Sequence, residues 1–166
     1  FKQKTAYEIY QCDWSSDVCS SDLDALLEHQ RGLAALARRE YSAAELKRKL
    51  AAHAASDEAL EEALKALKDR GYLSDARFAE SFITRQAARK GTSFIKQSLK
   101  QHQLPAELIA TVTTDLQASE ESRARQLWER RFGEVALDPK ERLRQMRFLA
   151  SRGFSHDVLR RIVRQD

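Results

Sequence analysis

The chain has 166 residues, of which 42% are hydrophobic and 33% are charged, with only five Gly and two Pro. This composition is typical of a helical globular protein and excludes a β-sandwich or a disordered chain. Lys and Arg outnumber Asp and Glu by 29 to 25. No apolar run is long enough to span a membrane or to form the apolar part of a secretory signal. We therefore expect an all-α protein of the cytoplasm.

The N-terminal residues 1–23 contain both cysteines, Cys12 and Cys19. A zinc site would need further Cys or His ligands that this segment lacks, and a disulfide is typical of secreted mini-proteins, which the rest of the chain does not resemble. Residues 14–23, WSSDVCSSDL, back-translate to a sequencing-library adapter, and residues 2–9, KQKTAYEI, to the matching flow-cell primer. We interpret residues 1–23 as a non-native leader, expect it to be disordered, and exclude it from the fold.

Residues 24–77 are predicted to form a first repeat of three helices. Leucines at three- and four-residue steps from Leu26 predict the first helix. Ser42-Ala-Ala-Glu45 is a capping-box pattern that opens the second helix, and Ser56 is placed to cap the third. Gly71 follows the third helix, where a left-handed residue is needed to end it.

Residues 78–118 are predicted to form a second repeat of the same kind. A helix from Phe78 ends near Gly91, and Thr92 or Ser93 is expected to cap a short helix that contains Leu99. The sequence Leu-Pro-Ala-Glu, residues 104–107, opens the third helix, because Pro in a first turn loses no helical hydrogen bond.

Residues 119–166 are predicted to form a third repeat. The second helices of the three repeats align at Leu50, Leu99 and Leu149, which lie 49 and 50 residues apart. Such a near-constant spacing indicates tandem repeats that stack on one another. The predicted fold is therefore three tandem three-helix repeats in an elongated, curved array.

Four segments of the chain together resemble a known family. They are residues 36–50 (LARREYSAAELKRKL), 70–79 (RGYLSDARFA), 131–134 (RFGE) and 147–154 (RFLASRGF). In this order and spacing they are similar to the bacterial RecX family, which regulates the RecA recombinase. The resemblance implies a non-catalytic protein that binds the RecA filament, with DNA contacted inside the filament, and that inhibits strand exchange and co-protease activity. A stand-alone helical DNA-binding module is the alternative, and we expect a monomer in either case.

Basic residues are the candidate binding groups, because positive charge is concentrated towards the C-terminus. Over residues 82–116 and 121–166, seventeen basic residues face nine acidic ones, whereas residues 24–81 carry ten and eleven. Such clusters attract phosphates or acidic protein surfaces. The candidates are Arg38, Arg39, Lys47, Arg48, Lys49, Arg85, Arg89, Lys90, Lys96, Lys100, Arg130, Arg131, Arg142, Arg144 and Arg147.

Aromatic residues at helical spacing are expected to pack in the core and not to stack on nucleobases. They are Phe78, Phe82, Phe94, Trp128, Phe132 and Phe148. Tyr72 and Phe154 follow helix-ending glycines, and both are expected to be buried between helices.

Neither a catalytic centre nor a cofactor site is predicted. The four His residues are scattered and have no Cys or Glu at ligand spacing. Ser155-His156-Asp157 does not form a hydrolase triad, because adjacent residues at a helix start point in different directions. The isolated glycines form no phosphate-binding loop, so no metal and no nucleotide are expected.

Overall fold

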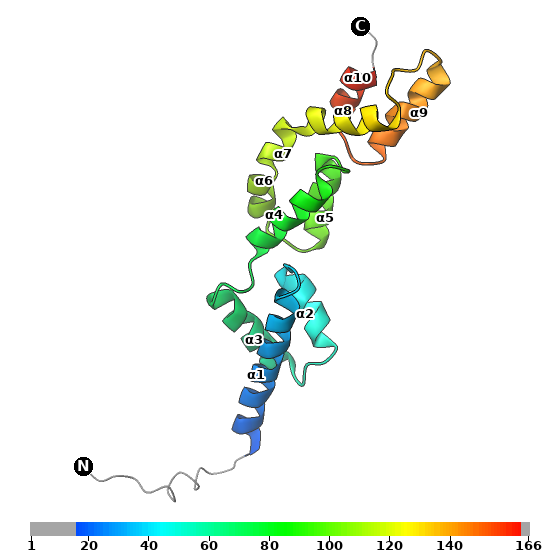
Figure 1. The fold of residues 1–166 in the computed structure, drawn as a ribbon. Coiled ribbons are helices and arrows are strands. Elements are labelled where there is room, and N and C mark those ends of the chain that lie inside the picture. The colour runs from blue at the N-terminus through cyan, green and yellow to red at the C-terminus, as the bar shows by residue number, and fades with distance from the viewer. Residues whose placement is uncertain (1–15, 164–166) are drawn as a thin grey trace, which may run out of the picture. The chain divides into compact units, whose positions relative to one another are not determined.

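The structure of the chain is a computed structural model that describes the backbone of residues 16–163 and the side chains of residues 22–163. Every regular element in these residues is a helix, which confirms the all-α prediction (Figure 1). The chain divides into two compact units. Within the described residues, one unit contains the chain up to Arg39 together with Glu45–Leu73, and the other contains Glu40–Ala44 together with residues 74–163.

The first unit is built from three helices, α1 (Ser16–Leu36), α2 (Ala43–Ala51) and α3 (Asp57–Asp69). Helix α1 packs along α3, and Gly32 makes this close approach possible. A Cβ at Gly32 would lie 2.5 Å from a methyl carbon of Leu67. As predicted, Ser56 caps α3 by accepting a hydrogen bond from the Ala59 N–H (3.2 Å), and Gly71 has a φ of 73°.

Helix α1 begins earlier than the sequence predicts. Residues 16–23 belong to the segment expected to be disordered, yet they form the first two turns of α1. The physical reason is that each residue added to an existing helix gains a hydrogen bond at low cost, and no Pro or Gly interrupts this stretch. The expectation of disorder is therefore wrong for residues 16–23, and residues 1–15 lie outside the described residues.

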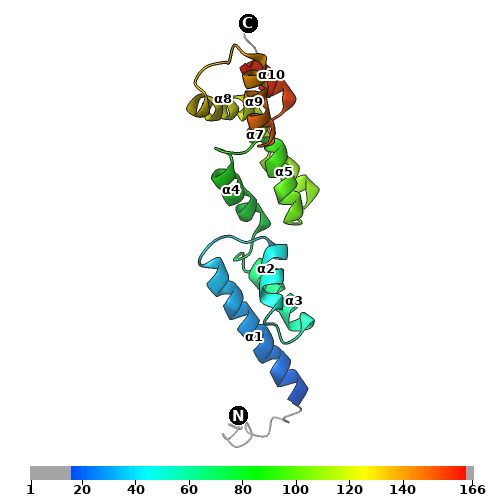
Figure 2. The same cartoon turned by 90° about the vertical axis from the view of Figure 1, so that its right-hand side faces the viewer.

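The second unit contains two groups of helices, each with its own hydrophobic core (Figure 2). The first core is centred on Phe78, Ile95 and Leu99, and the second on Trp128, Leu149 and Leu159. The two groups correspond to the predicted second and third repeats, which share one compact unit. The helices are α4 (Asp75–Gln86), α5 (Thr92–Gln101), α6 (Ala106–Val112), α7 (Thr114–Ala118), α8 (Glu120–Arg131), α9 (Pro139–Ala150) and α10 (His156–Val163).

The third helix of the second repeat is broken into α6 and α7 at Thr113. The Thr113 hydroxyl donates to the Ile109 carbonyl (2.6 Å), and its backbone φ and ψ of −99° and 0° leave the helical region. Thr84, Thr111 and Thr114 make the same hydroxyl contact four residues back but do not break their helices. The break at Thr113 coincides with its burial, since its side chain is 1% exposed.

The backbones of the two repeats of the second unit approach each other closely at Gly91 and Gly153. The Gly91 N–H donates to the Arg152 carbonyl (2.8 Å). A Cβ at Gly91 would collide with the Gly153 carbonyl, and a Cβ at Gly153 would lie 2.7 Å from the Phe94 backbone N. Gly153 also has a φ of 79°, which L side chains rarely adopt. The junction therefore depends on glycine on both sides.

Thr92 does not cap α5 as expected. The residue is buried, and its hydroxyl donates to the Leu116 carbonyl (3.3 Å) while its N–H donates to Glu120 Oε1 (2.9 Å). Gly91 occupies the cap position without a side-chain hydrogen bond. The local cap was predicted from neighbouring residues, whereas the structure uses partners more than twenty residues away.

The aromatic residues are packed as predicted, with one exception. Phe78, Trp128 and Phe154 are buried, Phe82, Phe132 and Phe148 are half-buried against the two cores, and Phe94 is half-buried. Tyr72 is 50% exposed, so the prediction that it is buried between helices is wrong. Leu73, which is 4% exposed, is buried instead. The buried position after Gly71 is therefore one residue later than the sequence pattern predicts.

A membrane-spanning helix was also sought in the described part of the chain. None of its helices combines the length and the apolar character that a bilayer crossing requires.

Candidate functional site

The predicted cations of the first unit divide into paired and unpaired groups. Arg39 forms an ion pair with Glu45, and Lys47 forms one with Glu61. The Glu61 carboxylate, through its hydrogen bond, raises the pKa of Lys47 above its ordinary value. Two of the predicted binding residues are therefore already engaged within the first unit.

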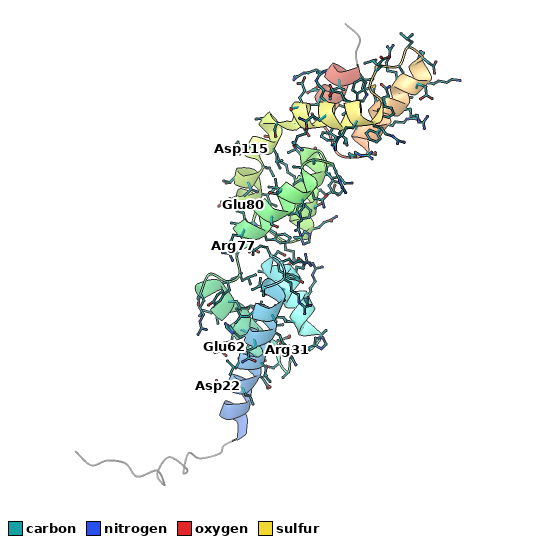
Figure 3. All side chains as sticks on the ribbon, viewed as in Figure 1. Asp22, Arg31, Glu62, Arg77, Glu80 and Asp115 are labelled. Atoms are coloured by element: carbon teal, nitrogen blue, oxygen red, sulfur yellow. The ribbon has the colours of Figure 1, made fainter. Side chains whose placement is uncertain are left out.

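Helices α1 and α2 border an open pocket of about 300 Å³ that carries positive charge on its rim. Arg38 lies here, and its side chain has no hydrogen-bond or ion-pair partner among the described residues. Arg31, which was not predicted, reaches across from α1 and donates to the His53 carbonyl (2.9 Å) (Figure 3). We call this the Arg38 pocket, and it is lined by Arg31, Ala34, Ala35, Arg38, Lys49, Leu50 and His53.

In the second repeat the candidates differ in how their charge is presented. The Arg85 Nε donates to the Ser81 carbonyl of its own helix (3.2 Å), and the Lys90 ammonium lies 4.1 Å from the centre of the Phe94 ring. Arg89, Lys96 and Lys100 have no side-chain hydrogen bond or ion pair among the residues described. These three cations remain available to an external anion.

In the third repeat, two of the predicted arginines act within the protein. Arg142 is half-buried and donates to the carbonyls of Ala136 (3.2 Å) and Leu137 (3.5 Å), so it holds the loop before α9. Arg144 pairs with Glu141 (3.4 Å) on the same helix. Arg147 is exposed and has no such partner within residues 22–163. An external contact is therefore expected for Arg147 and not for Arg142.

Arg130 and Arg131 share a second cationic pocket, of about 580 Å³. Leu127, Arg130 and Arg131 are three and four residues apart on α8, so they share one helix face. Phe148 on α9 and Arg152 in the turn after it complete the lining. We call this the Arg131 pocket, defined by these five residues.

Arg152 is fixed in place, although sequence reasoning did not select it. Its guanidinium carbon lies 3.7 Å from the centre of the Phe148 ring, and its Nη1 donates to the Phe148 carbonyl (2.9 Å). A cation four residues after an aromatic residue in a helical stretch is a signal for this contact.

Arg123 has a structural role at the junction of the two repeats. Its guanidinium donates to the carbonyls of Ala87 (2.9 Å), Lys90 (2.9 Å) and Leu116 (2.8 Å). Burial lowers the pKa of Arg123, and the nearby Glu120 carboxylate acts in the opposite direction. Because all its donors face inward, Arg123 stabilises the junction and contributes little to an outer surface.

A third pocket, of about 410 Å³, lies beside α4, α6 and α7 and has acidic character. Glu80 on α4 and Asp115 on α7, both labelled in Figure 3, contribute to its lining. Thr84 and Ser119 also line the pocket, and their hydroxyls donate to carbonyls four residues earlier. None of the predicted cations lines this pocket.

Groups of three or more His, Cys, Asp or Glu that could hold a metal ion were sought within the described residues. There are none in that part of the chain.

Two family models match the chain. The second three-helix domain of RecX matches residues 74–112, and the third three-helix domain of RecX matches residues 119–163. Both matched ranges lie in the second unit.

Curated relatives share much of the sequence. Regulatory protein RecX of Ralstonia nicotianae is 48% identical over 133 residues, which cover 80% of this chain and 84% of the relative. Regulatory protein RecX of Leptothrix cholodnii is 46% identical over 134 residues, covering 81% of this chain and 85% of the relative.

Two solved structures share the fold. A crystal structure of regulatory protein RecX matches 97% of this chain and 78% of its own, with a TM-score of 0.75 and 19% identity. RecX from Lactobacillus salivarius matches 84% of this chain and 94% of its own, with a TM-score of 0.68 and 18% identity. At these identities the likeness establishes the fold alone.

Proposed function

Because this chain belongs to the RecX family of regulatory proteins, we propose that it binds the filament that the RecA recombinase forms on DNA and inhibits it. The family is not enzymatic, so regulation has to come from binding. A bound regulator changes the state of a filament only by the difference between its affinities for the two states. We expect the protein to bind more tightly to a filament state that is inactive in strand exchange.

The observation that carries this proposal is the set of unpaired cations in the second unit. Arg89, Lys96, Lys100, Arg131 and Arg147 have no carboxylate partner within the described residues. The second unit therefore carries five positive charges that no described carboxylate neutralises, and such charges attract an anionic partner. A nucleoprotein filament supplies both phosphates and protein carboxylates.

Binding to the filament is expected to be stronger than binding to bare DNA. Fluorescence anisotropy would compare a labelled single-stranded oligonucleotide, bare and coated with RecA and a slowly hydrolysed ATP analogue, at the same salt. We expect a lower Kd for the coated strand, and a loss of at least about tenfold in affinity when NaCl rises from about 50 to about 200 mM, because bound counter-ions compete with the cations.

Two results would contradict this expectation. A lower Kd for the bare oligonucleotide would indicate the stand-alone DNA-binding module. An affinity for the filament that does not change with salt would show that the unpaired cations do not contribute to the interface.

A further inference from the structure

The Arg131 pocket differs from the other cationic surfaces because it combines three guanidinium groups with apolar walls. Leu127 and Phe148 form those walls, and no acidic side chain lines the pocket within the part of the chain that the structure describes. Pockets of several hundred Å³ with apolar walls and a few fixed polar groups are typical of binding sites. The question is which kind of anion suits this combination.

The guanidinium groups of this pocket have N–H donors left for an anion. Within residues 22–163, the exposed Arg131 side chain has no partner, and Arg130 donates only through its Nε, to the Gln126 carbonyl (3.4 Å). Arg152 is held by the Phe148 ring and carbonyl, so little side-chain entropy is lost when it binds. Arginine pairs with carboxylates and phosphates through two parallel hydrogen bonds, which a lysine does not form.

The apolar walls favour a protein partner over nucleic acid. A phosphodiester backbone has no apolar group to cover Leu127. A nucleobase needs the open face of an aromatic ring for stacking. The Phe148 ring has the Arg152 guanidinium over one face and lies 5.1 Å from the Phe132 ring at an interplanar angle of 85°. A peptide segment with an acidic residue beside an apolar one complements the charge and the apolar walls together.

From this geometry we propose that the Arg131 pocket binds an acidic segment of a protein partner. A carboxylate of that segment pairs with Arg131 and Arg152, and a neighbouring apolar side chain covers Leu127 and Phe148. The proposal rests on the proposed function only in taking the RecA filament as the natural partner. The guanidinium groups and apolar walls of the pocket by themselves match a carboxylate next to an apolar group.

The test compares Arg131→Ala with Arg125→Ala. Arg125 lies on the same helix, and its exposed side chain pairs with Glu121 (3.5 Å) outside the pocket. Both changes remove one positive charge from α8. We expect Arg131→Ala to raise the Kd for RecA-coated oligonucleotide about tenfold, as central arginines of protein interfaces do. Arg125→Ala should change it less than about twofold, and the Kd for bare oligonucleotide should be unchanged by either variant. Thermal unfolding checks that both remain folded.

Two results of this comparison would overturn the proposal. In the first, Arg131→Ala weakens binding to bare and coated DNA equally, and the slope of log affinity against log salt concentration falls by about one. That result would show that the pocket holds a phosphate. If Arg131→Ala and Arg125→Ala behave alike on the coated strand, the pocket is not part of the interface.

A second measurement is independent of RecA. Nuclear magnetic resonance titrations of the full chain would use three probes, a decapeptide of alternating Glu and Leu, the same peptide with Gln in place of Glu, and a ten-nucleotide oligothymidine. We expect the Nε–H signals of Arg131 and Arg152 and the methyl signals of Leu127 to shift with the Glu peptide only. Shifts with oligothymidine alone, or with no probe, would overturn the proposal even if the protein binds no RecA filament.

Discussion

Replacing Gly91 with Ala is expected to destabilise the second unit by about 3 kcal/mol, at the upper end of the usual cost of overpacking. The new Cβ would collide with the carbonyl of Gly153 and the backbone N of Phe154. Backbone atoms of a packed turn yield less than the end of a flexible side chain. The hydrogen bond from the Gly91 N–H to Arg152 would be strained by the same displacement. Urea unfolding of the full chain, followed by circular dichroism, measures the change.

Gly133→Ala is the matched control for Gly91→Ala. Gly133 has a φ of 75° but open space around its Cβ position, whereas Gly91 has a φ of −76° that any residue adopts. The control therefore reports backbone strain alone, which costs about 1 kcal/mol. If Gly91→Ala is no more destabilising than Gly133→Ala, the two repeats do not meet as closely as described.

Replacing Arg123 with Ala is expected to cost about 1.5–3 kcal/mol, the range for hydrogen bonds made by a charged group. The carbonyls of Ala87, Lys90 and Leu116 would each lose a hydrogen bond. Glu120, which is 7% exposed, would lose the nearby positive charge. Arg123→Lys should recover only a small part of the loss, because an ammonium group does not reach this set of acceptors with a planar fork.

Arg125→Ala, two residues further along the same helix and on a different face, is the control for Arg123→Ala. Arg125 is exposed, and we expect its loss to change the free energy of unfolding by less than about 1 kcal/mol. If the two changes lower the free energy of unfolding equally in a denaturant titration, the hydrogen bonds of Arg123 to the three carbonyls make no net contribution to stability.

Much of the fold is predictable because it depends on local rules. The spacing of Leu50, Leu99 and Leu149 identified equivalent helices, and all three leucines are buried. Ser56 and Gly71 mark helix ends through contacts within a few residues, which a sequence displays directly.

Two of the errors concern contacts beyond a single helix. Thr92 has the pattern of a cap, but its hydroxyl donates to Leu116 of the same repeat and its N–H donates to Glu120 of the next repeat. Tyr72 follows a glycine as a buried residue might, but the turn buries Leu73 in its place. Neither outcome is encoded within one helix, so local patterns do not predict it.

The sequence shows which residues of the candidate site are positively charged, but not which of them have a hydrogen-bond or ion-pair partner. Arg130 and Arg131 were predicted as candidates from their charge, and in the structure both line one pocket. The sequence did not separate Arg147, which is unpaired within the described residues, from Arg142, whose guanidinium holds a loop. That distinction needs the position of the carbonyl groups of residues 136 and 137, which only the folded loop provides.

The proposed function of this protein is to inhibit RecA by binding its filament. The most direct test is RecA-driven strand exchange between a circular single strand and a linear duplex, with increasing amounts of the full chain added after the filament has formed. We predict that the amount of joint molecules decreases as the protein is added, and that this decrease becomes smaller when the salt concentration is raised. An unchanged rate of exchange, at concentrations where anisotropy shows the filament to be saturated, would contradict it.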